Sequence, residues 1–359
     1  NIPLFFQIKN DVDIHVLERS LQAIVHRHEV LRSFIATDSK GNGYQQVNDT
    51  PLSITWENKE NIKQIYWALG QDANHIFNLS GEYPIRIKLY EAPQQTRYLS
   101  IVIHHIAFDG WSVNILAREI ASYYHHYSPK DKTDILPLAG PALQYKDFAV
   151  WQKSYLNPER LQREVSYWKE KLSGFETLQL TTDKPRPPEL SYQGDYLRFD
   201  LDEETSRRLR HTAKELKVSL YSLLLSGCYL MLKAYSNQQD ITIGTPIANR
   251  NYPQTEDLIG FFVNSLALRA SIDGNQTATS FIRTIGEEVV QAQLHQDLPF
   301  EKLVQELQVP VDPSRHPIFQ VVFATEQISE HETKSLELLE PEELPQAAYQ
   351  VAKFDLTII

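Results

Sequence analysis

Residues 101–112 read IVIHHIAFDGWS, so two histidines, a carboxylate and a glycine stand together at the end of an apolar run. The run from Tyr98 to Ile103 is typical of a β-strand, and the apolar residues after Gly110 recur at helical spacing. We therefore predict a strand-to-helix connection, a place where catalytic groups are often carried. If the strand includes both histidines, their side chains alternate and only one faces a given cavity.

The residues of this turn suit acyl-transfer chemistry better than metal binding. Gly110 allows a backbone or a substrate to approach closely, and the following helix presents free N–H groups and the positive end of its dipole. An imidazole beside such donors suits a reaction in which an oxyanion develops. A metal site built from His104, His105 and Asp109 is disfavoured, because adjacent strand histidines diverge and no nearby Cys or Glu completes a ligand set. The chain also lacks the Gly-x-Ser-x-Gly sequence of serine hydrolases.

Composition limits the class of protein. The 359 residues are 42% hydrophobic and 23% charged, which is typical of a globular chain with two domains or one large one. A net charge of −11, without a block of Lys and Arg, argues against a nucleic-acid partner. No signal peptide or membrane span is visible, and the single cysteine, Cys228, cannot form an intramolecular disulfide. We expect a cytoplasmic protein without a membrane partner.

Both halves of the chain mix strand and helix patterns, so the predicted fold class is α+β. In the first half we expect one long helical region over residues 144–172 after the turn. A proline-rich break at residues 184–188 then separates the halves. The second half is predicted to begin with a strand over residues 196–201, and the most apolar stretch, residues 220–235, is predicted to be a buried helix. We place the boundary between residues 1–180 and 181–359.

The turn resembles the HHxxxDG signature of the condensation domains of nonribosomal peptide synthetases. Further motifs of that family follow in the family's order. They are RHEVLRSF at 27–34, YKDFAVW at 145–151, IGFFVNS at 259–265, HQDLPFE at 295–301 and DPSRHP at 312–317. Two positions depart from the family pattern: Val311 stands where the last motif usually has Arg, and His316 where it often has Asn. The set of motifs, more than any one of them, identifies the chain as a member of this family.

The resemblance implies two chloramphenicol-acetyltransferase-like lobes that form a V-shaped pseudo-dimer with a central tunnel. Residues 1–180 would be the N-terminal lobe with the HHxxxDG motif, and residues 181–359 the C-terminal lobe. The family's first motif, Ser-x-Ala-Gln, does not occur, and the sequence stops in a β-like run at 354–359. We therefore expect the start of the first lobe and a closing strand and helix of the second to lie outside this sequence.

The resemblance also implies roles for the residues of the site. His105 would face the tunnel as a general base or as a group that positions the amine, while His104 packs within the lobe. Asp109 would form a structural ion pair with an arginine of the other lobe, for which Arg250 is the best candidate. Gly110 would supply an N–H near the thioester oxygen. The remaining candidates, expected to line the tunnel or contact substrate, are Trp111, Ser112 and Asn264. Trp111 could instead pack between the lobes, and Ser112 could serve as a helix N-cap.

The implied reaction is amide bond formation, in which an acceptor aminoacyl amine attacks a donor acyl or peptidyl thioester. Both substrates would be carried on the 4'-phosphopantetheine of donor and acceptor carrier domains, beside an adenylation domain of a larger synthetase, and no cofactor or metal would be bound permanently. Epimerization domains are disfavoured because Gly110 to Val113 lacks the Ser-Trp-Arg that they usually carry, and heterocyclization domains because their aspartates do not replace the two histidines here. Two alternatives stay open: a standalone acyltransferase that uses carrier- or CoA-bound donors, and a catalytically silent docking domain.

Overall fold

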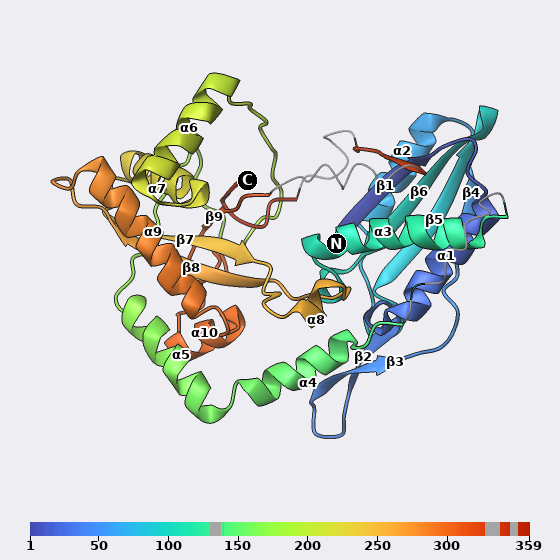
Figure 1. Ribbon diagram of the computed structural model, residues 1–359, viewed down its shortest axis with the longest axis horizontal. Helices are drawn as coiled ribbons and strands as arrows, with labels where there is room; N and C mark the ends of the chain where they lie inside the picture. Colours follow the sequence, from blue (N-terminus) through green and yellow to red (C-terminus); the bar gives the residue numbers. More distant parts are fainter. Residues whose placement is uncertain (130–137, 139, 327–337, 345–350) are drawn as a thin grey trace. The chain divides into compact units, whose positions relative to one another are not determined.

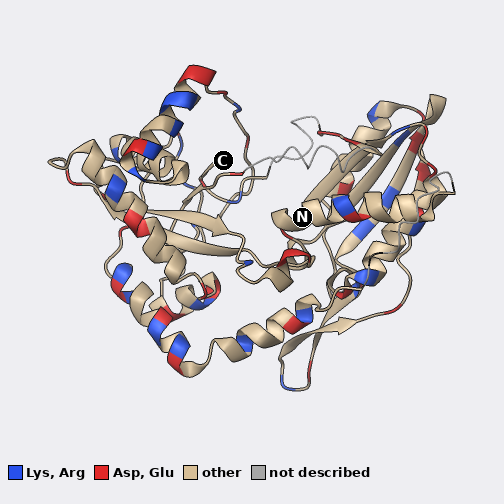
Figure 2. Ribbon diagram, viewed as in Figure 1, with Lys and Arg blue, Asp and Glu red and all other residues tan. Residues whose placement is uncertain are grey.

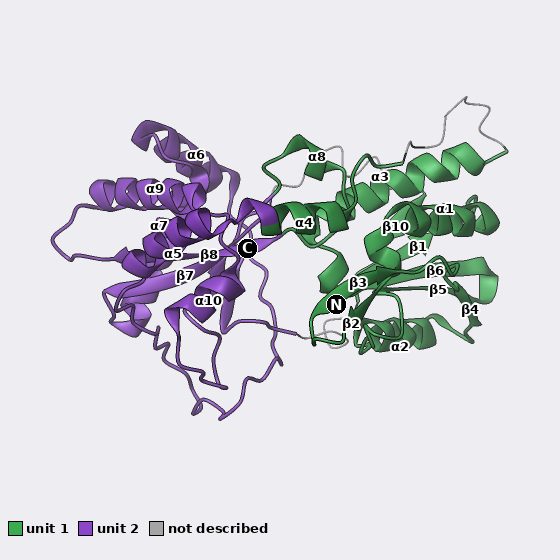
Figure 3. Ribbon diagram, turned by 90° about the horizontal axis from the view of Figure 1, so that it is seen from below, with its two compact units in different colours: residues 1–153, 250–262, 328–349 green, residues 154–249, 263–327, 350–359 purple. Residues whose placement is uncertain are grey.

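The computed structural model describes residues 1–129, 138, 140–326, 338–344 and 351–359. These residues form two compact units, coloured separately in Figure 3. Unit 1 holds the described residues of Asn1–Lys153, Arg250–Phe262 and 328–349, and unit 2 holds those of Ser154–Asn249, Val263–Gln327 and Gln350–Ile359. Each unit combines one main sheet with helices, which gives the mixed α/β architecture expected from the sequence.

Unit 1 is built on a five-stranded sheet in the order β10-β1-β6-β5-β4. Its strands are β1 (Ile2–Ile8), β4 (Thr55–Asn58), β5 (Ile85–Ala92), β6 (Thr96–Ile103) and β10 (Leu339–Pro341). Only β4 with β5 is a parallel pair; the other neighbours are antiparallel. A separate hairpin joins β2 (Ser33–Thr37) and β3 (Gly43–Val47). The sequence pattern predicted β6, the strand that leads into the motif, but not β1 or β10, whose partners lie far away in the sequence.

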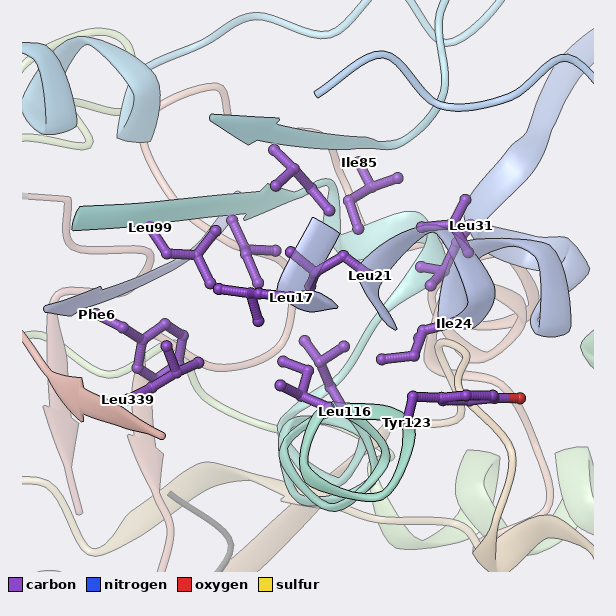
Figure 4. Packing of buried hydrophobic residues seen from close by; sticks show 14 of the residues in the cluster. Phe6, Leu17, Leu21, Ile24, Leu31, Ile85, Leu99, Leu116, Tyr123 and Leu339 are labelled. Atoms are coloured by element: carbon purple, nitrogen blue, oxygen red, sulfur yellow. The ribbon is translucent and has the colours of Figure 1, made fainter. Parts of the chain in front are cut away.

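Helices cover both faces of the unit 1 sheet. Its helices are α1 (Ile14–Arg27), α2 (Ile62–Ala73), α3 (Gly110–Tyr127), α4 (Tyr145–Tyr155), which runs into unit 2, and α8 (Pro253–Glu256), with short 3-10 turns η1 (Glu29–Arg32), η2 (Pro93–Gln95) and η3 (His105–Ala107). Helices α1 and α3 pack on one face, where Leu17, Leu21 and Leu116 meet Phe6 and Leu99 of the strands (Figures 1 and 4). Helix α2 packs on the other face. This two-sided packing fixes the end of β6, from which the HHxxxDG turn departs.

Unit 2 has a four-stranded sheet in the order β11-β9-β7-β8. Its strands are β7 (Asp240–Ile247), β8 (Asn264–Ser271), β9 (Val321–Phe323) and β11 (Leu356–Ile358), and its helices are α5 (Pro158–Lys171), α6 (Glu203–Leu216), α7 (Leu220–Ser236), α9 (Ala278–Leu294) and α10 (Phe300–Leu307). The sheet packs with α7, α9 and α5 in one apolar core. Strands β7 and β8 are antiparallel neighbours, yet the chain between them leaves unit 2 and packs in unit 1.

Three local predictions differ from the structure. The segment 196–201 forms no strand, because it has no ladder partner among the described residues, and its Leu197 and Phe199 side chains are 88% and 72% exposed. The region 144–172 is two helices, since Asn157 caps α5 with Pro158 in its first turn, which ends the preceding helix. The units also divide first at Lys153, before the expected boundary at 180, because α5 packs its Val165 into the unit 2 core.

Charged residues of both signs alternate along the outer faces of helices such as α5 and α6 (Figure 2). Within the described residues, no single helix is long and apolar enough to cross a bilayer. Helices α6 and α7 pass that criterion only when taken together, and they are bent by 104° at the break between them. Leu225 and Tyr229 of α7 are buried, as the prediction of a core helix requires.

Candidate active site

The HHxxxDG turn begins where β6 ends at Ile103, one residue before the two histidines. His104 caps the 3-10 turn η3: its backbone N–H donates to the Pro84 carbonyl at 2.8 Å, and its Nδ1 accepts from the Ile106 N–H at 3.0 Å. The histidines therefore do not alternate along a strand, as they would if β6 continued through them. They are separated instead by the change from strand to 3-10 turn, because the hydrogen bonds of η3 replace those of the ladder.

His104 is held as a neutral imidazole inside unit 1. Its Nδ1 accepts a hydrogen bond, so the ring proton of the neutral form lies on Nε2. Burial lowers the pKa of His104 below its ordinary value of 6.5. The ring of Phe77 packs edge-on against it, with the ring centroids 5.8 Å apart. These contacts agree with the predicted internal packing of His104.

His105 is the first residue of η3 and is half-buried. Its imidazole meets the ring of Phe261 in a T-shaped arrangement, with centroids 5.0 Å apart and planes at 81°. Phe261 belongs to the segment 250–262 that connects β7 with β8 and packs in unit 1. The partner of the predicted catalytic histidine therefore comes from a part of the chain more than 150 residues away.

Asp109 is fully buried and serves as the N-cap of α3. Its Oδ1 accepts from the backbone N–H of Ser112 at 2.9 Å and from the Ser112 hydroxyl at 2.7 Å. Its Oδ2 accepts from the backbone N–H of Phe262 at 3.0 Å. An Nη of Arg250 lies 3.0 and 3.2 Å from the two oxygens. A carboxylate with this many donors is saturated, so Asp109 orders the turn and has no lone pair directed at a substrate.

Arg250 forms the predicted ion pair with Asp109, and both side chains are at most 1% exposed. The second Nη of Arg250 donates to the carbonyls of Thr255 and Leu258, the latter at 2.7 Å. The guanidinium carbon lies 4.1 Å from the centroid of the Phe262 ring. Burial lowers the pKa of Arg250, and Asp109 opposes that shift. Arg250 and the rest of 250–262 pack in unit 1, so the pair joins two segments of one unit.

Ser112 lies inside this polar cluster and is fully buried. Its hydroxyl accepts from the Gly260 N–H and from Arg250, each at 3.2 Å, while it donates to Asp109. The structure thus corrects two expectations for Ser112. The N-cap of α3 is Asp109, because the helix begins at Gly110. The Ser112 side chain lines no open surface, because it is fully buried and bonded to Asp109, Arg250 and Gly260.

Gly110 and Trp111 form the exposed start of α3. A Cβ at Gly110 would meet no atom within 4 Å, so no described part of the protein requires a glycine there. The Trp111 side chain is 46% exposed, and its Nε1 donates to the Glu256 carbonyl at 3.0 Å. Among the described residues, the backbone N–H groups of Gly110 and Trp111 have no acceptor, as is usual in the first turn of a helix.

Asn264 links segments of unit 2 through side-chain hydrogen bonds. Its amide nitrogen donates to the Gln296 and Leu298 carbonyls at 2.9 and 2.8 Å, and its Oδ1 accepts from the Phe300 N–H at 3.0 Å. The side chain is buried and its hydrogen bonds are made within the protein. The expected contact of Asn264 with substrate therefore has no support in its surroundings, because a saturated amide has no donor to spare.

The sequence motifs did not indicate that Tyr145 supports the 260–262 segment. The Tyr145 hydroxyl donates to the Phe261 carbonyl at 2.8 Å, and burial raises the pKa of Tyr145 to about 12. The Tyr145 ring also fills the space beside Gly260, where a Cβ would lie 2.4 Å from its Cδ2. Tyr145 and Phe261 each lie in a family motif, but a motif does not show which residues contact one another in the fold. No group of three or more metal-ligating residues occurs in the described part of the chain.

The HHxxxDG turn and the buried Asp109–Arg250 pair thus lie together in unit 1 of a two-unit α/β fold. The chain belongs to the condensation-domain family, whose match covers residues 1–359. It is 40% identical to N-(5-amino-5-carboxypentanoyl)-L-cysteinyl-D-valine synthase of Amycolatopsis lactamdurans over 95% of this chain and 9% of that protein. It is 34% identical to malpinin synthetase of Mortierella alpina over 100% of this chain and 5% of that protein.

Solved structures establish the fold. The X-domain from teicoplanin biosynthesis superposes with a TM-score of 0.87 at 24% identity, over 99% of this chain and 79% of that one. The condensation domain of the Monacolin K polyketide synthase MokA gives a TM-score of 0.82 at 18% identity, over 99% and 82%. The predicted two-lobed, chloramphenicol-acetyltransferase-like fold class is therefore confirmed. Condensation domains of peptide synthetases form peptide bonds, an acyltransferase-type reaction, so the predicted function class is confirmed as well.

The chain spans a tenth or less of the length of the two synthetases named above. Those relatives are multidomain proteins, whereas this chain matches one domain of them. The roles of individual site residues, the substrates and the partners are therefore matters for proposal.

Proposed function

We propose that this domain joins a donor acyl or peptidyl group to the amine of an acceptor aminoacyl group, each delivered as a thioester on the phosphopantetheine arm of a carrier domain. The observation that supports the proposal most is the position of His105. It lies at the start of a turn whose shape is fixed on one side by the His104 cap and on the other by the saturated Asp109. Such rigid support suits a group that must meet a reacting atom within a narrow range of geometry.

The bond changes set what the site must do. The acceptor nitrogen attacks the donor carbonyl carbon, the C–N bond forms, and the tetrahedral oxyanion collapses as the C–S bond breaks. The donor carrier thiol leaves, and the nitrogen loses a proton. A thioester is already activated, so the step needs no ATP and no metal. The domain contributes alignment of the two thioesters, a path for the proton and stabilisation of the oxyanion.

His105 is assigned the contact with the amine, as general base or as positioning group, since an imidazole titrates near neutral pH. The N–H groups of Gly110 and Trp111 at the start of α3 are assigned to the oxyanion, because their donors and the helix dipole favour negative charge there. The exposed Gly110 leaves room for a thioester to reach them. Asp109, Arg250 and Ser112 hold the turn and are too buried to touch substrate.

The proposed partners are a donor and an acceptor carrier domain and an adjacent adenylation domain, as expected for a segment of a multidomain synthetase. Phosphopantetheine would enter as part of the substrates. Within the described residues no cluster suits a metal, and no step above uses one. The cytoplasmic location predicted from composition stays a prediction.

The test compares acceptors. The domain, within its full-length protein, is mixed with an acyl-loaded donor carrier and either an aminoacyl-loaded carrier or the free amine, and products are measured by intact-protein mass spectrometry. We expect the acyl mass to appear on the acceptor carrier. Transfer only to the free amine, or only from a CoA donor, would replace the proposal with a standalone acyltransferase. Carrier or partner binding without transfer to any acceptor would replace it with a docking domain.

A further inference from the structure

The segment 260–262 is fixed against the HHxxxDG turn by backbone contacts. The Gly260 N–H donates to the Ser112 hydroxyl at 3.2 Å, and the Phe262 N–H donates to Asp109 at 3.0 Å. The Phe261 carbonyl accepts from the Tyr145 hydroxyl at 2.8 Å. Three consecutive residues are therefore anchored through their main chain, and the position of the middle side chain is set by the anchors on both sides of it.

That middle side chain is Phe261, and its ring meets the imidazole of His105. The centroids are 5.0 Å apart and the planes are at 81°, which is the edge-to-face geometry that aromatic rings prefer. Gly260 must stay without a side chain for this arrangement, because a Cβ there would lie 2.4 Å from Tyr145 and 2.8 Å from the Phe262 ring. The segment therefore lies close enough to the turn for residue 261 to reach the imidazole.

The neighbouring ring, Phe262, has a different set of contacts. It packs against Phe148 and Tyr145, with centroids 4.6 and 5.2 Å away, and lies under the Arg250 guanidinium. Phe262 is 2% exposed and belongs to the interior, whereas Phe261 is only half-buried. The two adjacent phenylalanines therefore differ in role: Phe262 anchors the segment, and Phe261 contacts His105.

We infer that Phe261 is a positioning residue for the reaction, which holds the His105 imidazole in one orientation through an edge-to-face ring contact. The inference rests on the proposed function, since it assigns Phe261 no contact with substrate and lets it act through His105. An aromatic ring is required because its flat face and electropositive edge prefer one mutual orientation with the imidazole. An aliphatic side chain of similar size fills the space but imposes no such orientation.

The test uses three variants of the whole domain. Phe261→Leu keeps the apolar volume and removes the ring, Phe261→Tyr keeps the ring, and Phe199→Leu removes a ring that is 72% exposed in unit 2. We expect Phe261→Leu to lower kcat roughly threefold to tenfold with little change in KM. Loss of the ring contact should reduce stabilisation of the transition state more than it reduces substrate binding. Phe261→Tyr and Phe199→Leu should match wild type. Equal rates for Phe261→Leu and wild type would overturn the inference.

A second measurement does not depend on activity. Three-bond NMR couplings across the Cα–Cβ bond of labelled His105 report its side-chain rotamer, and His105→Ala identifies the signals. We expect one rotamer in wild type and Phe261→Tyr, and averaging among rotamers in Phe261→Leu. An unchanged single rotamer in Phe261→Leu would refute the positioning role. If no carrier-dependent transfer is found for wild type, the proposed function fails, while these couplings still decide whether Phe261 orients His105.

Discussion

Replacing Asp109 with Asn tests whether the Asp109–Arg250 pair holds the active-site turn together. The change keeps the size of the side chain but places an NH2 group among donors: the Phe262 N–H, the Ser112 hydroxyl and the Arg250 guanidinium. Arg250 would then be a cation with a side chain 1% exposed and no counter-charge beside it. The Phe262 N–H would also lose its acceptor if the new NH2 group faces it.

The expected cost follows from these contacts. Breaking a buried ion pair by removing one partner costs about 3–5 kcal/mol, because the remaining charge stays uncompensated. We therefore expect Asp109→Asn to lower the free energy of unfolding of unit 1 by about 3–5 kcal/mol. This is a large part of the roughly 5–15 kcal/mol that stabilises a typical domain. Transfer activity should fall with it, since the 250–262 segment and the turn share this anchor.

The assay is urea unfolding monitored together with hydrogen exchange of the 250–262 segment. The matched control is Asp257→Asn in the same segment, where Asp257 and Arg118 form a pair at 2.6 Å with side chains 72% and 58% exposed. An exposed pair contributes about 0.2–1 kcal/mol, so the control should stay near wild type and keep the segment protected. Asp109→Asn within about 1 kcal/mol of wild type, with unchanged exchange in 250–262, would refute the reasoning.

Four further predictions concern His104, Cys228 and two glycines. In an NMR titration, the pKa of His104 should lie below 6.5, because burial lowers it, and a midpoint at or above 6.5 would contradict this. Since the pKa is lower in the folded state, the stability that His104 contributes should be lost as pH falls below about 6.5. Cys228 is buried and burial raises its pKa to about 11, so a thiol reagent at pH 8 should label it much more slowly in the native protein than in urea, and equal rates would count against the packing of α7. Gly260→Ala should destabilise the domain by about 1–3 kcal/mol through overlap with Tyr145. Gly110→Ala should fold normally and lose transfer activity only if substrate approaches α3 there, so full activity would remove the assignment of the α3 N–H groups to the oxyanion.

The sequence predicted most of the local elements because their patterns are local. The apolar spacing of Leu17, Leu21 and Ile24 places one face of α1 in the core, and the alternation of Ile85, Ile87 and Leu89 does the same for β5. The segment 196–201 alternates equally well but forms no strand, since a strand also needs a partner and the pattern of one segment does not contain it. The break between α4 and α5 was visible as Asn157-Pro158, a cap followed by a proline.

The sequence located the HHxxxDG turn but did not determine the contacts of the residues around it. The pairing of Asp109 with Arg250 came from family resemblance, because no local rule connects residues 141 positions apart. The burial of Ser112 and Asn264 was not predicted. A polar residue in a motif is easily interpreted as functional when its hydrogen-bond partners within the fold are unknown. The ring contact between His105 and Phe261 was missed for the same reason: both residues lie in known motifs, but only the fold brings them together.

The role of His105 in an amide-forming condensation between two carrier-bound substrates is central to the proposed mechanism. It is tested most directly by single-turnover transfer between a loaded donor and a loaded acceptor carrier, with wild type, His105→Ala and the control His15→Ala, whose side chain is 93% exposed on α1. We predict an acceptor mass raised by the acyl group in wild type and His15→Ala, with a rate at least about a hundredfold lower in His105→Ala, the lower end of general acid–base contributions. Equal transfer by wild type and His105→Ala would contradict this role.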